Sequence, residues 1–317
     1  MNKRIQLNEI QNYLCKKGCN REDRQEVAEN DICTEVKSVI DQLPVRCVGE
    51  WGIEKIYLLN QYFGIFSIGM KNVWKGEINY IEICGGPGRC INRKNGNEFD
   101  GTALSIVRHK AFQHIKKAIF FDFNGLVVDT LNERFKNLGV VKAKAYLGNY
   151  NNSSELCAKI KSEINAYSLN LVFIDPTDCS VPFSLIKEIK KTIPKADLII
   201  NVASFTDFNR NVKKALLNPD THQSSINKYG RFLDNDISFF QDNKNLVLAQ
   251  QNNSLMLRKN FREVYLRKLK NIGYNESEYK QIEHYYDILF SSEHKKGLEF
   301  WKKATITDHH GQRSLDF

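Results

Sequence analysis

The sequence predicts a Rossmann-like α/β fold in which helices flank a largely parallel sheet. Between residues 79 and 201, short apolar segments rich in β-branched residues alternate with segments of helical periodicity. Such alternation is typical of crossover connections between parallel strands. Several of the apolar segments also end in an acidic residue or a glycine, and parallel sheets bind ligands at the carboxyl ends of their strands. We therefore expect these ends to converge on one ligand-binding crevice.

The composition is that of a folded protein with a basic surface. The chain has 317 residues, enough for one large domain or a domain with an appendage, and its formal net charge is +9. An excess of positive charge favours an anionic partner such as nucleic acid. The alternative is a lysine-rich composition without a binding role, since the charge is not concentrated in one block.

Two further features bear on location and on metals. No apolar run approaches the roughly 18 residues needed to span a bilayer, and residues 1–6 lack the apolar segment of a signal peptide, so we expect a cytoplasmic protein. The eight cysteines are then expected to be free thiols and not disulfides. Cys15 and Cys19 stand four residues apart without a neighbouring histidine, so neither a zinc site nor an iron–sulfur cluster is predicted.

The first 48 residues are predicted to form a small helical extension that precedes the main domain, residues 49–317. Within this extension, apolar residues recur at helical spacing at Val36, Val39, Ile40 and Leu43. A proline follows directly, as is common after the end of a helix.

The main domain is predicted to alternate between strands and helices. An amphipathic helix over residues 51–66 should pack on a sheet that begins near Tyr80. Further strands are expected at residues 117–122, 141–147, 170–175 and 196–201, with helices at residues 102–112, 128–135, 154–167 and 182–193. A polar stretch at residues 207–255 is interpreted as an inserted cap. It is followed by a basic helix at residues 257–272, a strand pair at residues 279–284 and 285–291, and a last helix at residues 295–303.

The segment Asn79–Arg89 joins a short apolar strand to a glycine-rich turn. Three of the four residues 85–88 are glycines, so backbone N–H groups of the turn can approach a ligand closely. No Walker motif follows, and the turn lacks the G-x-G-x-x-G spacing of dinucleotide folds. The next strand-terminal acid, Asp122, lies 34 residues past Gly88, against about 20 in those folds. A nicotinamide cofactor is therefore disfavoured.

The order of these strand ends fits the chemical parts of S-adenosyl-L-methionine (SAM). The glycine turn can meet the carboxylate of its methionine part, and Asp122 can accept both ribose hydroxyls. The pair Gly148-Asn149 can hydrogen-bond the adenine, and Asp175-Pro176 can face the transferred methyl group and its acceptor. Any single acid could instead cap a helix. In-line transfer of a methyl group from the sulfonium needs mainly correct positioning of the acceptor, so no strong base is required.

The candidate site residues fall into three groups. The predicted cofactor-binding residues are Glu82, Cys84, Gly85, Gly86, Gly88, Asp122 and Asn149. The predicted catalytic residues are Asp175 and Pro176. The predicted substrate-binding residues are Thr177, Asp178, Lys213, Lys214 and Arg231. No metal ligand is predicted.

From about residue 50 onward the sequence resembles the three-Cys-motif partner family. These are bacterial proteins with a class I methyltransferase-like fold, and the resemblance implies SAM binding and a protein partner that bears a cysteine motif. The tail, residues 311–315, is included in it. The segments that carry the resemblance are Glu50–Lys55, Tyr80–Arg89, Gly101–Ile106, Phe173–Pro176 and Tyr286–His294.

The sequence departs from the family pattern at the strand ends. In its first motif the family has Asp where this chain has Glu82, and Phe-Ala where this chain has Cys84-Gly85. At the end of the third strand the family has Gly-Asp, whereas this chain has Gly148-Asn149. The segment from Asp175 is similar to the Asp-Pro-Pro-Tyr signature of amino-methyltransferases but lacks an aromatic residue at position 178, which would stack on a target base. Two functions follow: a SAM-dependent methyltransferase acting on nucleic acid with a protein partner, or a degenerate subunit that binds a nucleotide or scaffolds a partner.

Overall fold

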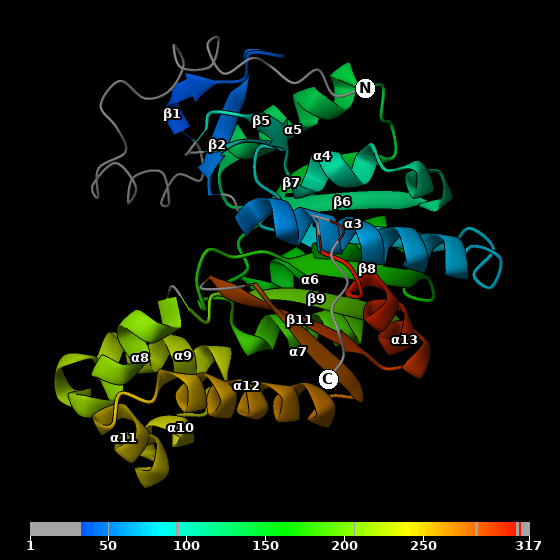
Figure 1. The fold of residues 1–317 in the computed structure, drawn as a ribbon. Helices are drawn as coiled ribbons and strands as arrows, with labels where there is room; N and C mark the ends of the chain where they lie inside the picture. The colour runs from blue at the N-terminus through cyan, green and yellow to red at the C-terminus, as the bar shows by residue number, and fades with distance from the viewer. Residues whose placement is uncertain are drawn as a thin grey trace. The chain divides into compact units, whose positions relative to one another are not determined.

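The structure is a computed structural model that describes residues 33–49, 51–92, 95–205, 207–282, 285–308 and 311. The chain divides into two compact units, one formed by residues 1–148 and 303–317 and the other by residues 149–302. Each unit contains parallel strands connected through helices (Figure 1). The predicted Rossmann-like α/β fold class is therefore confirmed.

Three parallel strands of the first unit run in the order β3 (Ile78–Ile83), β6 (Lys117–Asp122) and β7 (Ala143–Leu147). Every residue of β3 is buried. Because Asp122 pairs with Leu147 across β6 and β7, these two strands end side by side. The glycine turn leaves β3 at the same edge.

Among the described residues of this unit, the first helix is α3 (Trp51–Met70), which extends the predicted helix by one turn. It packs on β3 as expected, because the Phe63 ring meets the Tyr80 ring edge-on with their centroids 5.7 Å apart. The predicted helix at residues 102–112 is divided, since a 3₁₀ turn follows a short α-helix. The remaining helical elements of this unit are α4 (Thr102–Val107), η1 (Lys110–His114) and α5 (Gly125–Asn137).

The helical prediction for the N-terminal extension is wrong where the structure describes it. Residues 38–43 form a turn in which the Ser38 N–H donates to Leu43 O and the Gln42 N–H donates to Ser38 O, each at 2.9 Å. The apolar spacing does not mark a buried helix face, because Ile40 is exposed. The earlier part of the extension, with Cys15 and Cys19, lies outside the described residues.

Residues 33–37 and 44–48 form two strands of a second, four-stranded sheet. The strand order is β1-β2-β4-β5, with β2 parallel to β4 and the other two pairs antiparallel. Because β4 begins at Arg89, directly after the glycine turn, this sheet borders the turn. Its strands are β1 (Cys33–Lys37), β2 (Pro44–Val48), β4 (Arg89–Asn92) and β5 (Glu98–Asp100).

The second unit has a sheet in the order β8-β9-β11-β10, in which β8 and β9 are parallel and β11 is antiparallel to both neighbours. The predicted strand pair and final helix are confirmed. The α-helices α6 and α7 pack against each other. The elements are α6 (Ser153–Glu163), β8 (Leu169–Ile174), α7 (Phe183–Thr192), β9 (Ala196–Val202), β10 (Glu276–Ile282), β11 (Tyr286–Ser292) and α13 (Lys295–Ala304).

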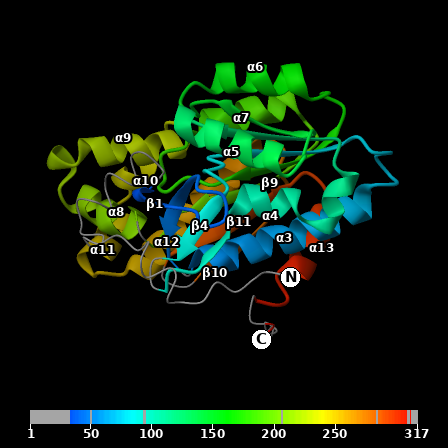
Figure 2. The same ribbon diagram turned by 90° about the horizontal axis from the view of Figure 1, so that it is seen from above.

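The segment interpreted as a cap, residues 207–255, is helical, and with the basic helix that follows it forms a cluster of helices between β9 and β10 (Figure 2). Its core is aromatic: the Phe261 ring lies 4.7 Å from the Phe208 ring and 5.7 Å from the Phe232 ring, centroid to centroid. The predicted basic helix is α12. The helices of this cluster are α8 (Asp207–Leu217), η2 (Pro219–Thr221), α9 (Gln223–Phe232), α10 (Ser238–Gln241), α11 (Asn243–Gln250) and α12 (Ser254–Asn271).

Within the described ranges, none of the helices combines the length and the apolar character that crossing a membrane requires. The same part of the chain holds no group of three or more His, Cys, Asp or Glu side chains placed to bind a metal ion. Its free cysteines include Cys47, Cys84, Cys90, Cys157 and Cys179.

Candidate functional site

The glycine turn after β3 has a left-handed backbone at three positions. The φ angles are +68° at Cys84, +61° at Gly86 and +92° at Gly88. Glycine adopts this conformation without strain, whereas a residue with a Cβ, such as Cys84, does so at a cost of about 1 kcal/mol. A Cβ at Gly88 would also lie 2.8 Å from Leu131 Cδ1, so this glycine allows α5 to pack closely over the turn.

The first N–H groups of the turn bond within the protein. Those of Cys84 and Gly85 donate to Phe121 O, at 2.9 and 3.0 Å, and that of Gly86 donates to Asp122 Oδ2 at 3.2 Å. The expectation that these amides meet a ligand carboxylate is therefore not supported. Their bonds hold the turn against the end of β6.

Glu82 supports the turn from inside the core. Its side chain is 0% exposed. Oε2 accepts the Tyr80 hydroxyl at 2.8 Å, and Oε1 accepts the hydroxyl of Thr102, the first residue of α4. The carboxylate thus joins β3 to α4 and is fully buried, and its direct contact with a cofactor stays a prediction.

Asp122 is the ligand candidate that the geometry of the first unit favours. Oδ2 accepts the Gly86 N–H, and Oδ1 accepts the Asn124 N–H at 3.1 Å. Burial raises the pKa of this carboxyl, which is 5% exposed, and the bonds from Asn124 and Gly86 offset the effect only in part. The alternative role as a helix cap is excluded, because Asn124 caps α5 by accepting the Leu126 N–H at 2.9 Å.

Exposed apolar side chains stand beside this acid. Phe123 directly follows Asp122 and is 49% exposed, and Leu147, the register partner of Asp122 on β7, is 66% exposed. Exposed apolar side chains next to a carboxylate suit a nucleoside, whose base needs an apolar contact and whose ribose needs an acceptor. Sequence reasoning did not include Phe123 or Leu147, although an aromatic residue directly after a strand-terminal acid was a visible signal.

Two buried arginines fix the far side of the turn. Arg134 of α5 donates through Nη1 to Pro87 O at 2.5 Å, and through Nε and Nη2 to the two oxygens of Asp41 at 2.8 and 3.0 Å. Arg89 lies within 3.4 Å of Asp41 and 3.3 Å of Glu98. Burial raises the pKa of Asp41, but the bonds from Arg134 and from the backbone outweigh it, so the net pKa is lowered. The turn is thus tied to the connection between β1 and β2.

In the second unit, Asp175 and Pro176 follow β8 and share one donor. The Asn201 amide, from the end of β9, donates to Asp175 Oδ1 at 2.9 Å and to Pro176 O at 3.1 Å. All three residues are buried. Asn201 therefore orients the two predicted catalytic groups, and sequence reasoning did not identify it because it lies within a regular strand.

The loop after Pro176 is tied to the helical cluster. Thr177 is exposed, and Asp178 accepts the Ser180 N–H at 3.1 Å. Lys228 of α9 lies 3.5 Å from Asp178 and binds both oxygens of Asp207, at 2.7 and 2.8 Å. Burial alone would lower the pKa of Lys228, but this pairing raises it. Asp178 is thus half-buried in a salt-bridged loop.

The other predicted ligand residues separate into two places. Asn149 is exposed and its side chain accepts the Asn151 N–H at 2.9 Å. Arg231 donates to the Asn151 side chain, so Arg231 and this turn are brought together. Lys213 instead donates to Asn252, between α11 and α12, and its neighbour Lys214 is exposed.

The candidate residues therefore form two groups, one in each unit. The glycine turn and Asp122 belong to the first unit, and Asn149, Asp175 and the basic residues belong to the second. Convergence of all four strand ends on one crevice stays a prediction.

Comparison with known proteins gives no family. No family model and no curated protein matches the chain. Among solved structures, the chain is similar to EvdMO1, at 11% identity and a TM-score of 0.37, over 74% of this chain and 42% of that one. It is also similar to protein LPL1258 from Legionella pneumophila, at 10% identity and a TM-score of 0.42, over 77% and 85% of the two chains.

A third similar structure is an S-adenosylmethionine-dependent methyltransferase from Clostridium acetobutylicum, at 13% identity and a TM-score of 0.29, over 52% of this chain and 54% of that one. The chain thus spans about half the length of this protein and less than half of EvdMO1. At these TM-scores the similarities carry no argument about function.

The buried arginine gives the first testable prediction. Replacing Arg134 by Met removes the partner of a half-buried carboxylate and the donor to Pro87, so we expect a loss of about 3 kcal/mol in the free energy of unfolding. Urea unfolding measures it. The control is Lys136→Met, an exposed position on the same helix, which should change the free energy of unfolding by less than about 0.5 kcal/mol. Equal unfolding midpoints for the two variants would contradict this role of Arg134.

Proposed function

We propose that the first unit binds SAM and that the chain transfers its methyl group to nucleic acid, together with a protein partner. The observation that carries the proposal is the bond between Asp122 and the Gly86 N–H, which joins the strand-terminal acid and the glycine turn in one site. The exposed Phe123 and Leu147 beside it complete a surface for a nucleoside.

The fit is good for the nucleoside part of SAM. Each oxygen of a carboxylate can accept two hydrogen bonds. Asp122 accepts backbone N–H groups of Gly86, Asn124 and Phe123, which leaves an acceptor position for a ribose hydroxyl. Phe123 offers a ring face to the adenine. When bound, SAM supplies a sulfonium-activated methyl group.

The acceptor side of the proposal rests on Asp175 and Pro176. An amine acceptor can donate its N–H groups to the carboxylate and to the Pro176 carbonyl, and Asn201 orients both of these acceptors. With no aromatic residue at position 178, stacking on a target base must come from elsewhere.

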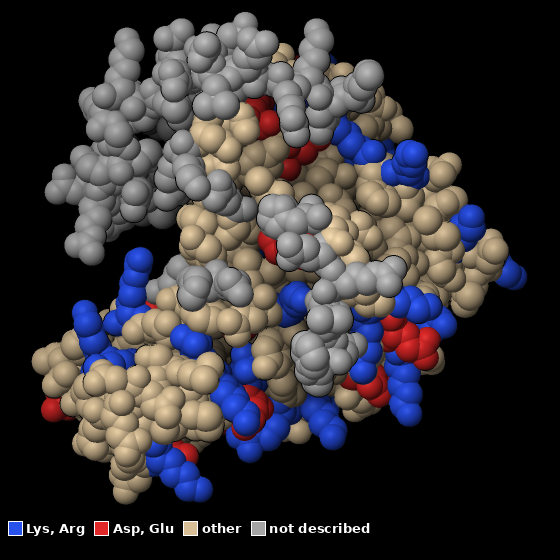
Figure 3. All heavy atoms as spheres, viewed as in Figure 1, with Lys and Arg blue, Asp and Glu red and all other residues tan. Residues whose placement is uncertain are grey.

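The nucleic-acid acceptor is supported by the distribution of charge. Residues 207–271 carry twelve Lys and Arg against six Asp and Glu, a net charge of +6 of the chain's +9. Figure 3 shows basic side chains spread over this part of the second unit. Lys214, Lys259, Arg267 and Lys270 are exposed there. Such a surface attracts a phosphate backbone whatever its sequence.

The protein partner rests on the resemblance to the three-Cys-motif partner family alone. That resemblance proposes a cysteine-motif protein as the partner. Co-expression of such a protein from the same genome with the tagged chain, followed by size-exclusion chromatography, tests for a complex.

A second candidate function is a subunit that binds a nucleoside without methyl transfer. It is favoured by the bonds that the N–H groups of Cys84, Gly85 and Gly86 make within the protein, because these donors are not directed to a methionine carboxylate.

The cofactor site is tested by replacing Asp122 with Ala. Loss of the ribose acceptor is expected to weaken SAM binding by about tenfold or more in isothermal titration calorimetry. Asp129→Ala, an exposed position on α5, is the control and should bind as the unmodified protein does. Because Asp122 also holds Gly86, thermal melts must show that the variant is folded. Unchanged affinity in a folded variant would remove Asp122 from the site.

The transfer step is tested by replacing Asp175 with Asn. We expect SAM affinity to be retained and transfer of tritiated methyl groups to nucleic acid to be lost, since the acceptor amine loses its charged partner. Asp220→Asn, an exposed position in η2, serves as the control. Full transfer by a folded Asp175→Asn protein would rule out a catalytic role for this carboxylate.

The two candidate functions differ in what the methionine part of SAM contributes. A nucleoside-binding subunit should bind adenosine and SAM with dissociation constants within about threefold of each other, because the ribose and the base make the contacts. A methyltransferase should bind SAM at least about tenfold more tightly, which corresponds to roughly 1.4 kcal/mol. Competitive calorimetry on the unmodified protein distinguishes the two.

A further inference from the structure

The first amides of the glycine turn do not face a ligand carboxylate. The N–H groups of Cys84, Gly85 and Gly86 donate to acceptors within the protein. A carboxylate in the methionine part of SAM therefore needs a donor from another part of the chain. An arginine is well suited, because its guanidinium can bind both oxygens of a carboxylate with two parallel hydrogen bonds.

Three arginines of the first unit lie near the turn, and they differ in burial. Arg134 and Arg89 are 2% and 4% exposed, and both pair with Asp41. Arg46 of β2 is only half-buried, so part of its side chain remains accessible to a ligand. Arg46 is therefore the arginine to consider for the carboxylate.

The register of the small sheet places Arg46 beside the turn. Arg46 pairs with Cys90 across β2 and β4, and Cys90 follows Gly88 by two residues. Paired residues of neighbouring strands share a face of the sheet. A Cβ on Gly101 would lie 3.3 Å from Cys90 Sγ, and the Gly101 N–H donates to Gly88 O at 2.7 Å. The face that carries Arg46 is thus the face turned towards the end of the glycine turn.

The other face of this sheet is apolar. Val45 and Ile91 form a small buried cluster, against which Cys47 packs. Because successive side chains of a strand point to opposite faces, Arg46, which stands between Val45 and Cys47, points away from this cluster. Both faces of β2 therefore agree on the side to which Arg46 belongs.

Electrostatics connect Arg46 with Asp122. Burial raises the pKa of the Asp122 carboxyl, the bonds from Asn124 and Gly86 lower it, and the positive charge of Arg46 also lowers it. The guanidinium therefore lies within electrostatic range of the acid proposed for the ribose. An acceptor for a ribose and a cation for a carboxylate at one site match a ligand that carries both groups.

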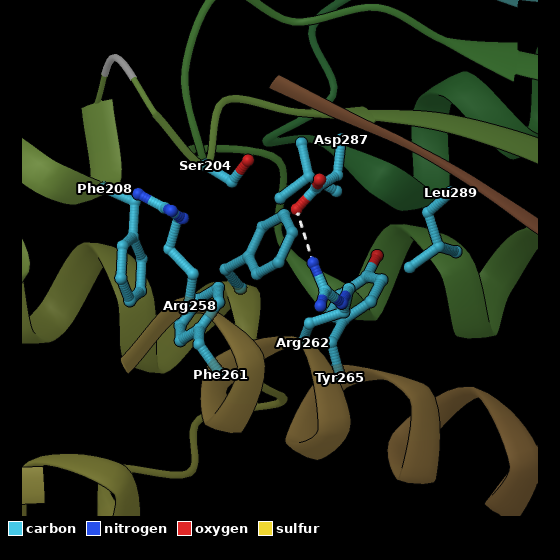
Figure 4. Close-up of a pocket in the computed structure, with 10 residues that line it drawn as sticks. Ser204, Phe208, Arg258, Phe261, Arg262, Tyr265, Asp287 and Leu289 are labelled. Carbon is cyan, nitrogen blue, oxygen red and sulfur yellow. Dashed lines mark hydrogen bonds and ion pairs between the residues drawn. The ribbon is translucent and has the colours of Figure 1, made fainter. Parts of the chain in front are cut away.

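The second unit also has two arginines at a hollow, Arg258 and Arg262 of α12 (Figure 4). The volume of this cavity is about 10 Å³, which is room for one water molecule and not for a carboxylate group. Arg262 also donates to Asp287 Oδ2 at 3.0 Å. This hollow is therefore not an alternative place for the carboxylate of a ligand.

We propose that Arg46 binds the carboxylate of the methionine part of SAM; this inference rests on the cofactor site proposed at Asp122 and names one further contact in it. The guanidinium donates two N–H groups to the carboxylate oxygens. Arg46 precedes the part of the sequence that resembles the three-Cys-motif partner family, so the family pattern does not reveal it. Strand β2 thereby selects a ligand with an amino-acid part over a bare nucleoside.

The experiment compares SAM with decarboxylated SAM, which lacks only this carboxylate, by calorimetry on the full chain. The unmodified protein should bind SAM at least about tenfold more tightly, the worth of a hydrogen-bonded charge pair. In Arg46→Gln, the affinity for SAM should fall at least about tenfold, whereas the affinity for decarboxylated SAM should change less than about threefold. The control Lys37→Gln removes a positive charge at an exposed position on β1 of the same sheet and should keep the preference.

The two ligands also differ in net charge, so the deciding quantity is the change in their affinity ratio when Arg46 is replaced. A third variant, Arg46→Lys, keeps the charge but loses the paired N–H groups of the guanidinium. Its preference for SAM should lie between those of the unmodified protein and Arg46→Gln.

Equal binding of the two ligands by the unmodified protein overturns the inference, whether or not the variants fold. A preference retained by Arg46→Gln also overturns it, and so does an equal loss of both ligands in a variant that thermal melts show to be folded. In each of these cases the unmodified protein still binds SAM, so the cofactor site at Asp122 stands. Binding of neither ligand by the unmodified protein would instead refute the proposed function, and this inference with it.

Discussion

The glycine turn depends on one buried cation, the guanidinium of Arg134. A buried charge is stable only when it is paired and its N–H groups are bonded. Asp41 and the Pro87 carbonyl meet both requirements, and the same bonds fix the middle of the turn. Since Asp41 lies in the connection between β1 and β2, the segment before residue 49 supports the candidate site directly. The left-handed glycines permit the shape of the turn, and the salt bridge selects it.

Asp122 links the shape of the turn to ligand binding. Its carboxylate accepts the Gly86 N–H and is also the acceptor proposed for a ribose. Because burial raises the pKa of this group, protonation begins at a higher pH than for an exposed aspartate. A protonated oxygen no longer accepts the same bonds, so both the turn and the ligand contact depend on the ionised form. One carboxylate therefore couples the local fold to the site.

The sequence predicted features that are set locally and missed those set by distant contacts. The strand that ends at Asp122 appeared at its observed bounds, because a run of apolar residues closed by an acid determines it. The apolar spacing of residues 36–43 predicted a helix, but bonds from Ser38 and Arg134 hold that segment as a turn. Glu82 was visible as an unusual strand residue, yet only the structure shows that Tyr80 and Thr102 occupy its carboxylate. Partners far away in the sequence leave no periodic signal.

The second unit holds its polar groups near the end of β9 in place through side-chain hydrogen bonds. At Asp175, the acceptors are already oriented by Asn201, so the site is preorganised and a ligand need not reshape it. The loop that follows is held by Lys228, which binds both oxygens of Asp207 and lies 3.5 Å from Asp178. Residues 207–271 carry +6 of the chain's net charge of +9, so the positive charge that would attract an anionic acceptor belongs to the same unit as these preorganised groups.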